Sequence, residues 1–225
     1  FGTYIHRIFE LGYTENHISQ LEKIAENIKK DYKVPLVYKE RIHQCLDNFL
    51  KFNKGLGETV AVEHEFSVDL AEGIKYNGFI DRIVRGLNGG MLIIDYKTSK
   101  KEKTRVELGR DKQLMGYAFA VSQEFKIPLS EIYCAHYYPL TDSLVSVKFT
   151  QGAVNSWRER ETAKVWKIRK KKKEEFPAMQ NQFCDWCEYK PMCPLFTDQC
   201  LVQQRIEEQK AQLKAKEETL PKTNG

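Results

Sequence analysis

The spacing of apolar residues divides the chain into an N-terminal helical part and a longer part in which strands and helices alternate. Apolar positions recur at helical spacing over 3–11, 15–30 and 35–50, which predicts three amphipathic helices. Gly55 and Gly57 are expected to end the third helix.

From Thr59 the apolar period changes to two, which is typical of β-strands. We predict strands over 60–68, 76–84 and 91–97, with a hairpin turn in the glycine-rich stretch 86–90. A helix over 108–125, strands near 132–139 and 144–149, and a long helix over 152–175 follow. This order indicates an α/β or α+β sheet covered by helices. The polar segment 203–216 is expected to be an exposed helix or a disordered tail.

Composition favours one soluble globular domain with a small appendage, since the 225 residues are 41% hydrophobic and 30% charged. No apolar run approaches the roughly 18 residues that cross a bilayer, and no signal-like segment opens the chain. An intracellular, cytoplasmic protein is therefore expected. Because Phe1 is not an initiator methionine, we expect residues to be missing upstream. The net charge of +5 is compatible with nucleic-acid binding but too small to establish it.

Charged residues at the end of one predicted strand suggest chemistry. Four apolar residues, 91–94, lead directly into Asp95 and Lys97, which strand periodicity places on one face. The preceding strand carries Asp81, and the hairpin can bring it close to Asp95. Two neighbouring carboxylates repel unless a proton or a cation lies between them, and Mg²⁺ prefers oxygen ligands. Lys97 could stabilise phosphate charge there, or help to orient and deprotonate an attacking water.

An ordinary ion pair between Asp95 and Lys97 is the commoner explanation when these residues are considered alone. Two further features change this interpretation. Gln113 and Tyr117 lie four residues apart on one face of the next predicted helix, and His6 lies on the first helix.

Together these residues resemble the motifs of the RecB-like branch of the PD-(D/E)XK nuclease superfamily. The matching segments, in the order and spacing of that branch, are 2–6 with His6, 78–83 with Asp81, 94–98 with Asp95 and Lys97, and Gln113-x-x-x-Tyr117. Glu63 stands where such proteins often have a glutamate. The resemblance extends from about residue 2 to residue 196.

The resemblance implies a restriction-endonuclease-like α/β core, in which a central mixed sheet is flanked by helices. It also implies DNA hydrolysis that depends on Mg²⁺ or Mn²⁺. The implied metal ligands are His6, Asp81, Asp95 and the main-chain carbonyl of Tyr96, the implied catalytic lysine is Lys97, and the implied helpers are Gln113 and Tyr117.

Three of the six cysteines, Cys184, Cys187 and Cys193, lie within ten residues. Close-set thiolates with aromatic residues between them and a proline after the last are typical of an iron–sulfur cluster or a Zn²⁺ site. Three buried structural thiols are the alternative. The Cys-x-Trp-Cys-x-Tyr pattern is similar to that of RecB-like nucleases with a cluster, including CRISPR-associated adaptation nucleases. The resemblance implies a [4Fe–4S] cluster, with Zn²⁺ as the second choice.

In those relatives a fourth cysteine precedes the histidine of the first motif, which here would place it upstream of Phe1. Cys200 or Cys45 is the alternative fourth ligand. The cluster is expected to fasten the C-terminal segment to the fold rather than to take part in hydrolysis.

Two basic segments are candidates for DNA contact: 98–105, which follows the catalytic strand, and the run 169–173, which solvation explains equally well. Tyr96 or Tyr117 could offer a stacking surface to bases. We expect a nuclease domain over 1–182, a cysteine segment over 183–200 packed on it, and a polar tail over 201–225.

The expected activity is that of an exonuclease on single-stranded DNA ends, with a helicase or another DNA-processing protein as partner. One alternative is a nuclease-like DNA-binding module of a helicase–nuclease or integration complex. The other is a metal-stapled interaction protein without catalysis.

Overall fold

The computed structural model describes residues 1–14, 17–86, 89–197 and 206–208. The chain divides into two compact units, Phe1–Trp166 and Lys167–Gly225. The expected division at residues 182 and 200 stays a prediction. Cys200 and most of the segment 203–216 lie outside the described residues. Within the described ranges, no helix is long and apolar enough to cross a membrane.

The first three helices form one layer of the first unit. They are α1 (Gly2–Thr14), α2 (Leu21–Tyr32) and α3 (Lys39–Lys54), with the short turns η1 (Ile18–Gln20) and η2 (Leu36–Tyr38) between them. The second helix begins at Leu21 and not at residue 15, because η1 precedes it. Apolar faces of the three helices meet in one core cluster, in which the rings of Phe9 and Phe49 stack 3.7 Å apart.

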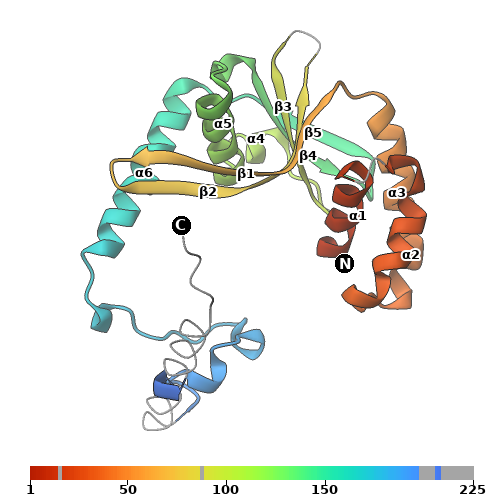
Figure 1. Ribbon diagram of the computed structural model, residues 1–225. Coiled ribbons are helices and arrows are strands. Elements are labelled where there is room, and N and C mark those ends of the chain that lie inside the picture. Colours follow the sequence, from red (N-terminus) through yellow and green to blue (C-terminus); the bar gives the residue numbers. More distant parts are fainter. Residues whose placement is uncertain (15–16, 87–88, 198–205, 209–225) are drawn as a thin grey trace, which may run out of the picture. The chain divides into compact units, whose positions relative to one another are not determined.

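A five-stranded mixed sheet forms the centre of the first unit, with its strands in sequence order (Figure 1). The strands are β1 (Thr59–Ala71), β2 (Ile74–Arg85), β3 (Met91–Tyr96), β4 (Ile132–Tyr138) and β5 (Ser143–Val147). All neighbours are antiparallel except β3 and β4. A parallel step needs a crossover, and here it contains α4 (Arg105–Leu108), α5 (Lys112–Phe125) and η3 (Leu129–Glu131). The predicted α/β class is confirmed.

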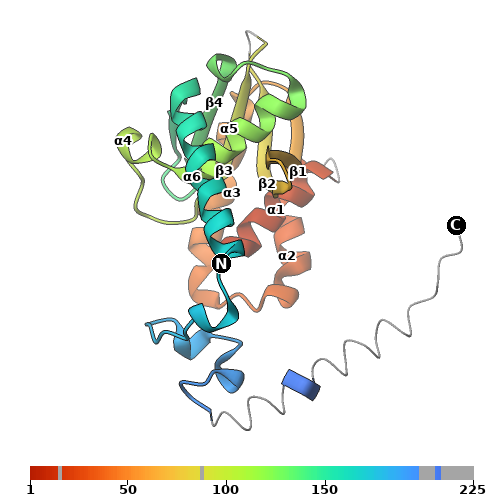
Figure 2. The same cartoon turned by 90° about the vertical axis from the view of Figure 1, so that its left-hand side faces the viewer.

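Helices cover both faces of this sheet (Figure 1). Ile93 of β3 belongs to the core cluster that contains residues of α5 and α6 (Gln151–Arg169), whereas Tyr96 belongs to the cluster with α1 and α3. Because side chains alternate along a strand, Asp95 and Lys97 continue the row of Ile93 on the α5 side. Figure 2 shows α5 in front of the strands, and it packs against β1 and β4.

Two further predicted helix boundaries are wrong. The helix predicted over 108–125 is divided, because Asp111 caps a new helix: its Oδ1 accepts hydrogen bonds from the main-chain N–H groups of Gln113 (3.0 Å) and Leu114 (3.1 Å). The long helix α6 ends at Arg169 instead of residue 175. Like charges crowd its end in the run 169–173, which disfavours further helix, and the short turn η4 (Lys173–Glu175) follows.

Candidate metal centre

His6 on α1, Glu63 on β1 and Asp81 on β2 meet at one corner of the sheet. One ligand atom from each residue lies within 4.8 Å of the other two. Nδ1 of His6 is 3.5 Å from Oδ2 of Asp81, and Nε2 of His6 is 2.9 Å from the main-chain oxygen of Tyr96. The main-chain N–H of Tyr96 donates to Oδ2 of Asp81 (2.7 Å), which joins the end of β3 to β2. Three of the four predicted ligand groups therefore come together.

The register of the sheet explains why the carboxylates converge. Val62 pairs with Arg82 and His64 with Ile80, so Glu63 lies opposite Asp81. On the other side of β2, Arg82 pairs with Ile94, and the next step along this register brings Asp81 beside Asp95. Glu63, Asp81 and Asp95 thus form a row across three strands. Side-chain Cβ atoms of directly opposed residues are typically about 4.5–5.5 Å apart.

Glu63 adopts an unusual backbone conformation within β1. Its φ is 45°, in the left-handed region, which costs a non-glycine residue about 1–3 kcal/mol. The alternation of side chains along β2 is also interrupted at this point. Ile80 and Ile83 both belong to the core on the α5 side of the sheet, whereas residues three apart on a regular strand point to opposite faces. The hairpin is therefore irregular where it carries Glu63 and Asp81.

Asp95 is only 3% exposed, and its Oδ2 lies 2.6 Å from Nζ of Lys97. Asp95 is not part of the group formed by His6, Glu63 and Asp81 in the described part of the chain. Lys97 also donates to Oε1 of Gln113 (3.3 Å). The structure thus contains the ordinary ion pair of the simpler interpretation, but places it beside the three-residue group.

Gln113 and Tyr117 of α5 form a chain of hydrogen bonds that starts at Lys97. Nε2 of Gln113 donates to the hydroxyl of Tyr117 (2.8 Å), while its Oε1 accepts from Lys97. Tyr96 and Tyr117 are 3% and 6% exposed, so neither ring is available to stack on a base. The stacking role considered from the sequence is therefore wrong for both.

Electrostatics at this corner favour an added positive charge. Burial, followed by repulsion from Asp81, raises the pKa of Asp95 to about 6, although Lys97 opposes the shift. Burial and then the charges of Asp81 and Glu10 raise the pKa of Glu63. Burial acts to lower the pKa of His6, but its hydrogen bond with Asp81 and the surrounding carboxylates outweigh burial and raise that pKa.

The donor set suits a hard divalent cation. It combines two carboxylates, an imidazole nitrogen and a main-chain carbonyl at one partly buried point, where the carboxylates repel each other. Oxygen-rich sites of this kind favour Mg²⁺ or Mn²⁺. An open cavity of about 500 Å³ adjoins the group, with lining residues that include Thr3, His6, Lys97 and Ser99. The group of His6, Glu63 and Asp81 is therefore reachable from solvent through this opening.

Two residues at the site were missed by the sequence interpretation. His136 of β4 lies 3.6 Å from Oδ2 of Asp95, and Asp111 lies 3.9 Å from His136 and 2.6 Å from Nζ of Lys103. A polar residue in the otherwise apolar strand 132–137 was the available signal for His136. For Asp111, the signal was an aspartate directly before a helical pattern.

The three predicted cluster ligands line one cavity of about 270 Å³ in the second unit, together with the apolar side chains of Met179, Phe183 and Phe196. Cys184, Cys187 and Cys193 are free thiols. Among the residues described, their sulfur atoms do not form a group within 4.8 Å of one another. Cys45, the other considered ligand, is buried in the helical core, which is the location expected of a structural thiol.

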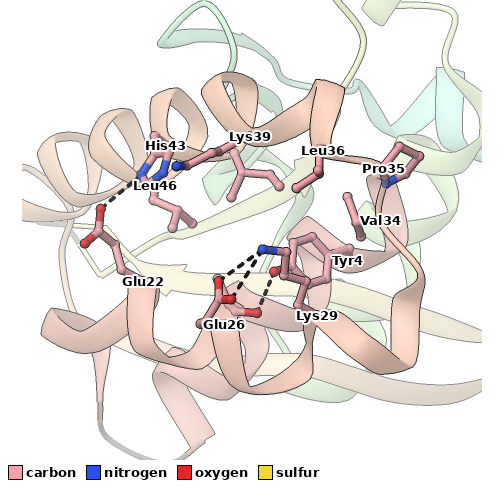
Figure 3. Close-up of a pocket in the computed structure, with 12 residues that line it drawn as sticks. Tyr4, Glu22, Glu26, Lys29, Val34, Pro35, Leu36, Lys39, His43 and Leu46 are labelled. Carbon is pink, nitrogen blue, oxygen red and sulfur yellow. Dashed lines mark hydrogen bonds and ion pairs between the residues drawn. The ribbon is translucent and has the colours of Figure 1, made fainter.

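A separate small cavity lies among the N-terminal helices (Figure 3). Apolar side chains such as Val34 and Leu46 line it, and ion pairs flank it, including Glu22 with His43 (3.1 Å). None of the ligand, lysine, glutamine or tyrosine residues of the metal centre lines this cavity. It is therefore distinct from the candidate site.

Comparison with known proteins identifies the family of the chain. Residues 1–194 match the PD-(D/E)XK nuclease superfamily. The chain belongs to this superfamily. The family and fold expected from the motifs are thus confirmed.

The chain spans only about 11–15% of the length of the two helicase/deoxyribonuclease subunits that it matches here. A subunit of the ATP-dependent helicase/deoxyribonuclease of Streptococcus mutans serotype c is 30% identical over 120 residues, which cover 44% of this chain and 11% of that protein. The protein of the same name from Streptococcus pyogenes serotype M1 is 26% identical over 161 residues. These residues cover 63% of this chain and 15% of that protein. The solved structure of SSO0001 is 16% identical, covers 87% of this chain and 85% of that chain, and has a TM-score of 0.40.

The backbone at Glu63 provides a test of this site. We expect Glu63→Gly to be more stable than Glu63→Ala by about 1 kcal/mol, because both variants remove the carboxylate but only glycine relieves the left-handed strain. Urea unfolding of the two variants measures the difference. Equal stabilities would show that the backbone at this position is not strained.

Proposed function

We propose that this chain is a Mg²⁺- or Mn²⁺-dependent DNA nuclease that acts as an exonuclease on single-stranded ends inside the cell. The observation that carries this proposal is the meeting of His6, Glu63 and Asp81 within 4.8 Å of one another, beside the Lys97–Asp95 pair. The superfamily to which the chain belongs supports hydrolysis of phosphodiester bonds. The names of its relatives support DNA as the substrate.

In this proposal His6, Glu63, Asp81, Asp95 and the carbonyl of Tyr96 hold the cation. A bound Mg²⁺ or Mn²⁺ would supply positive charge to the phosphate and lower the pKa of a water molecule. The part of the residues is to fix this geometry before the substrate arrives. The row of Glu63, Asp81 and Asp95 across paired strands leaves these carboxylates little freedom to rearrange.

Lys97 acts next to this group, on the face of the sheet toward α5. Asp95 and Gln113 hold its ammonium group from two sides, and Tyr117 in turn holds Gln113. A lysine fixed in this way can donate to a phosphate oxygen as negative charge develops, or orient a water molecule for attack. Gln113 and Tyr117 are therefore helpers of the lysine in this proposal.

DNA reaches the site along the segment that follows β3. Lys100 and Lys101 are exposed, and Thr98 and Ser99 line the open cavity beside His6. Basic and hydroxyl side chains are the usual contacts to phosphates. The relatives' shared name suggests a helicase as the partner of this protein.

Cleavage of end-labelled single-stranded DNA tests the proposed function. We expect wild-type protein to release nucleotides with Mg²⁺ or Mn²⁺ and to be inactive with EDTA. Lys97→Ala should lower kcat by about 10²–10³, because charge stabilisation at the phosphate is lost, and Asp81→Asn should have a similar effect through the cation.

Matched controls lie on the same hairpin. Asp69 and Lys75 form an exposed ion pair (2.7 Å) away from the group, so Asp69→Asn and Lys75→Ala should cut at the wild-type rate. Wild-type protein that binds DNA but never cuts it with either ion would contradict the nuclease and favour a DNA-binding module of a larger complex. Protein that neither binds nor cuts would favour an interaction protein.

We also propose that Cys184, Cys187 and Cys193 ligate a [4Fe–4S] cluster together with a fourth cysteine, either upstream of Phe1 or Cys200. Three free thiols that line one cavity, together with apolar side chains and those of Asn181 and Lys190, support this proposal. The cluster would fasten the second unit and leave hydrolysis to the metal centre.

Protein purified without oxygen should show broad visible absorbance and contain iron and sulfide. Cys187→Ser should lose both, whereas Cys134→Ser should keep them, because Cys134 is a fully buried thiol of the sheet core. Zinc in place of iron would change the assignment of the metal. A metal-free wild-type protein would contradict the cluster.

A further inference from the structure

His136 is a fourth polar member of the row across the sheet. It is the registered partner of Asp95 in the parallel pairing of β3 with β4. It is 0% exposed, and its Nε2 has no hydrogen-bond partner within 3.5 Å among the residues described. An unsatisfied buried polar group typically costs about 1–3 kcal/mol, so its presence calls for a physical explanation.

Nε2 of His136 points between two carboxylates. It lies 3.6 Å from Oδ2 of Asp95, at the end of β3, and 3.9 Å from Oδ2 of Asp111, which caps α5. Each carboxylate already has an ammonium group at 2.6 Å, from Lys97 and Lys103 respectively. Neither carboxylate therefore depends on a positively charged His136 as its ion-pair partner.

The neighbours of His136 favour a proton on Nε2, because two carboxylates, which only accept hydrogen bonds, face that nitrogen. The main-chain N–H of Lys103 donates to the hydroxyl oxygen of Tyr138 (2.9 Å). The hydroxyl proton of Tyr138 is then free to be donated to Nδ1 of His136, at 3.4 Å. When Nδ1 accepts a hydrogen bond, a neutral imidazole carries its proton on Nε2.

The proton on Nε2 of His136 faces both β3 and the start of α5. These two elements must be aligned for Asp95 and Gln113 to hold Lys97. β3 carries Asp95 and leads into Lys97, whereas the Asp111 cap starts the helix that carries Gln113. The Nε2–H group lies between the two carboxylates and attracts both. A change in their separation would alter the contact between Lys97 and Gln113.

We propose that His136 is a positioning residue, which holds Asp95 and the start of α5 in register so that Lys97 is correctly placed. This proposal rests on the proposed nuclease function. His136 acts through Asp95 and Asp111 and does not touch the substrate. Buried groups that orient metal ligands in this way typically contribute about 10–100-fold to activity or metal affinity.

Two substitutions of His136, to glutamine and to asparagine, test the proposal, because their amide groups lie at different distances from the backbone. The amide nitrogen of glutamine extends to about the position of Nε2, whereas that of asparagine reaches only to about the position of Nδ1. We expect His136→Gln to retain most of the wild-type kcat. His136→Asn and His136→Phe should lower kcat about 10–100-fold with KM within about twofold. His43→Phe is the control, since His43 of α3 pairs with Glu22 of α2 (3.1 Å) and neither residue belongs to the metal centre.

Melting temperatures of the same variants separate positioning from packing. Equal kcat values for the glutamine and asparagine variants, or a loss of activity that follows the melting temperature alone, would overturn the proposal.

The tautomer of His136 is measurable without any cleavage. Long-range ¹H–¹⁵N spectra of histidine-labelled wild-type protein should show a neutral ring protonated at Nε2, assigned by its absence in His136→Gln. A ring protonated at Nδ1 would overturn the proposal. If the wild type does not cut DNA, the nuclease assignment fails by itself, and the tautomer still decides whether His136 donates toward the two carboxylates.

Discussion

The register of β2 between its two neighbours is the constraint on which the site depends. It places Glu63, Asp81 and Asp95 in one row across the sheet, and parallel pairing adds His136 to that row. A slip of one residue would turn each of these side chains to the opposite face. The apolar residues on both sides of the row, which pack against separate helical layers, make such a slip costly. Core packing therefore fixes the positions of the charges.

The charges in turn explain the unusual local features. Carboxylates brought together in a partly buried corner have raised pKa values, as for Glu63 and Asp95, and lysine or histidine groups approach them from several elements. The left-handed backbone at Glu63 is a further local cost of this arrangement. Structures retain such costs where function requires a fixed geometry. Instability at this corner and the proposed affinity for a cation have the same physical origin.

The strands and helices, and the residues that share a face of each, could largely be predicted from the sequence, because local periodicity determines them. Alternation along 91–97 placed Asp95 and Lys97 on one face, and helical spacing placed Gln113 and Tyr117 together. The conformation of Glu63 and the contact of His136 with Asp95 could not be predicted, since they depend on pairing between distant strands. The break before α5 was missed although Asp111 offered a capping signal. The fourth cluster ligand stays a prediction because Cys200 lies outside the described residues.

The central claim is that this corner of the sheet binds a divalent cation. The most direct test is anomalous X-ray diffraction from crystals grown with Mn²⁺. The account predicts a manganese peak bounded by His6, Asp81 and the carbonyl of Tyr96, with ligand distances of about 2.0–2.5 Å. A carboxylate of Glu63 or Asp95 should complete the site. A peak elsewhere on the protein, or no peak at this corner when Mn²⁺ is saturating, would contradict it.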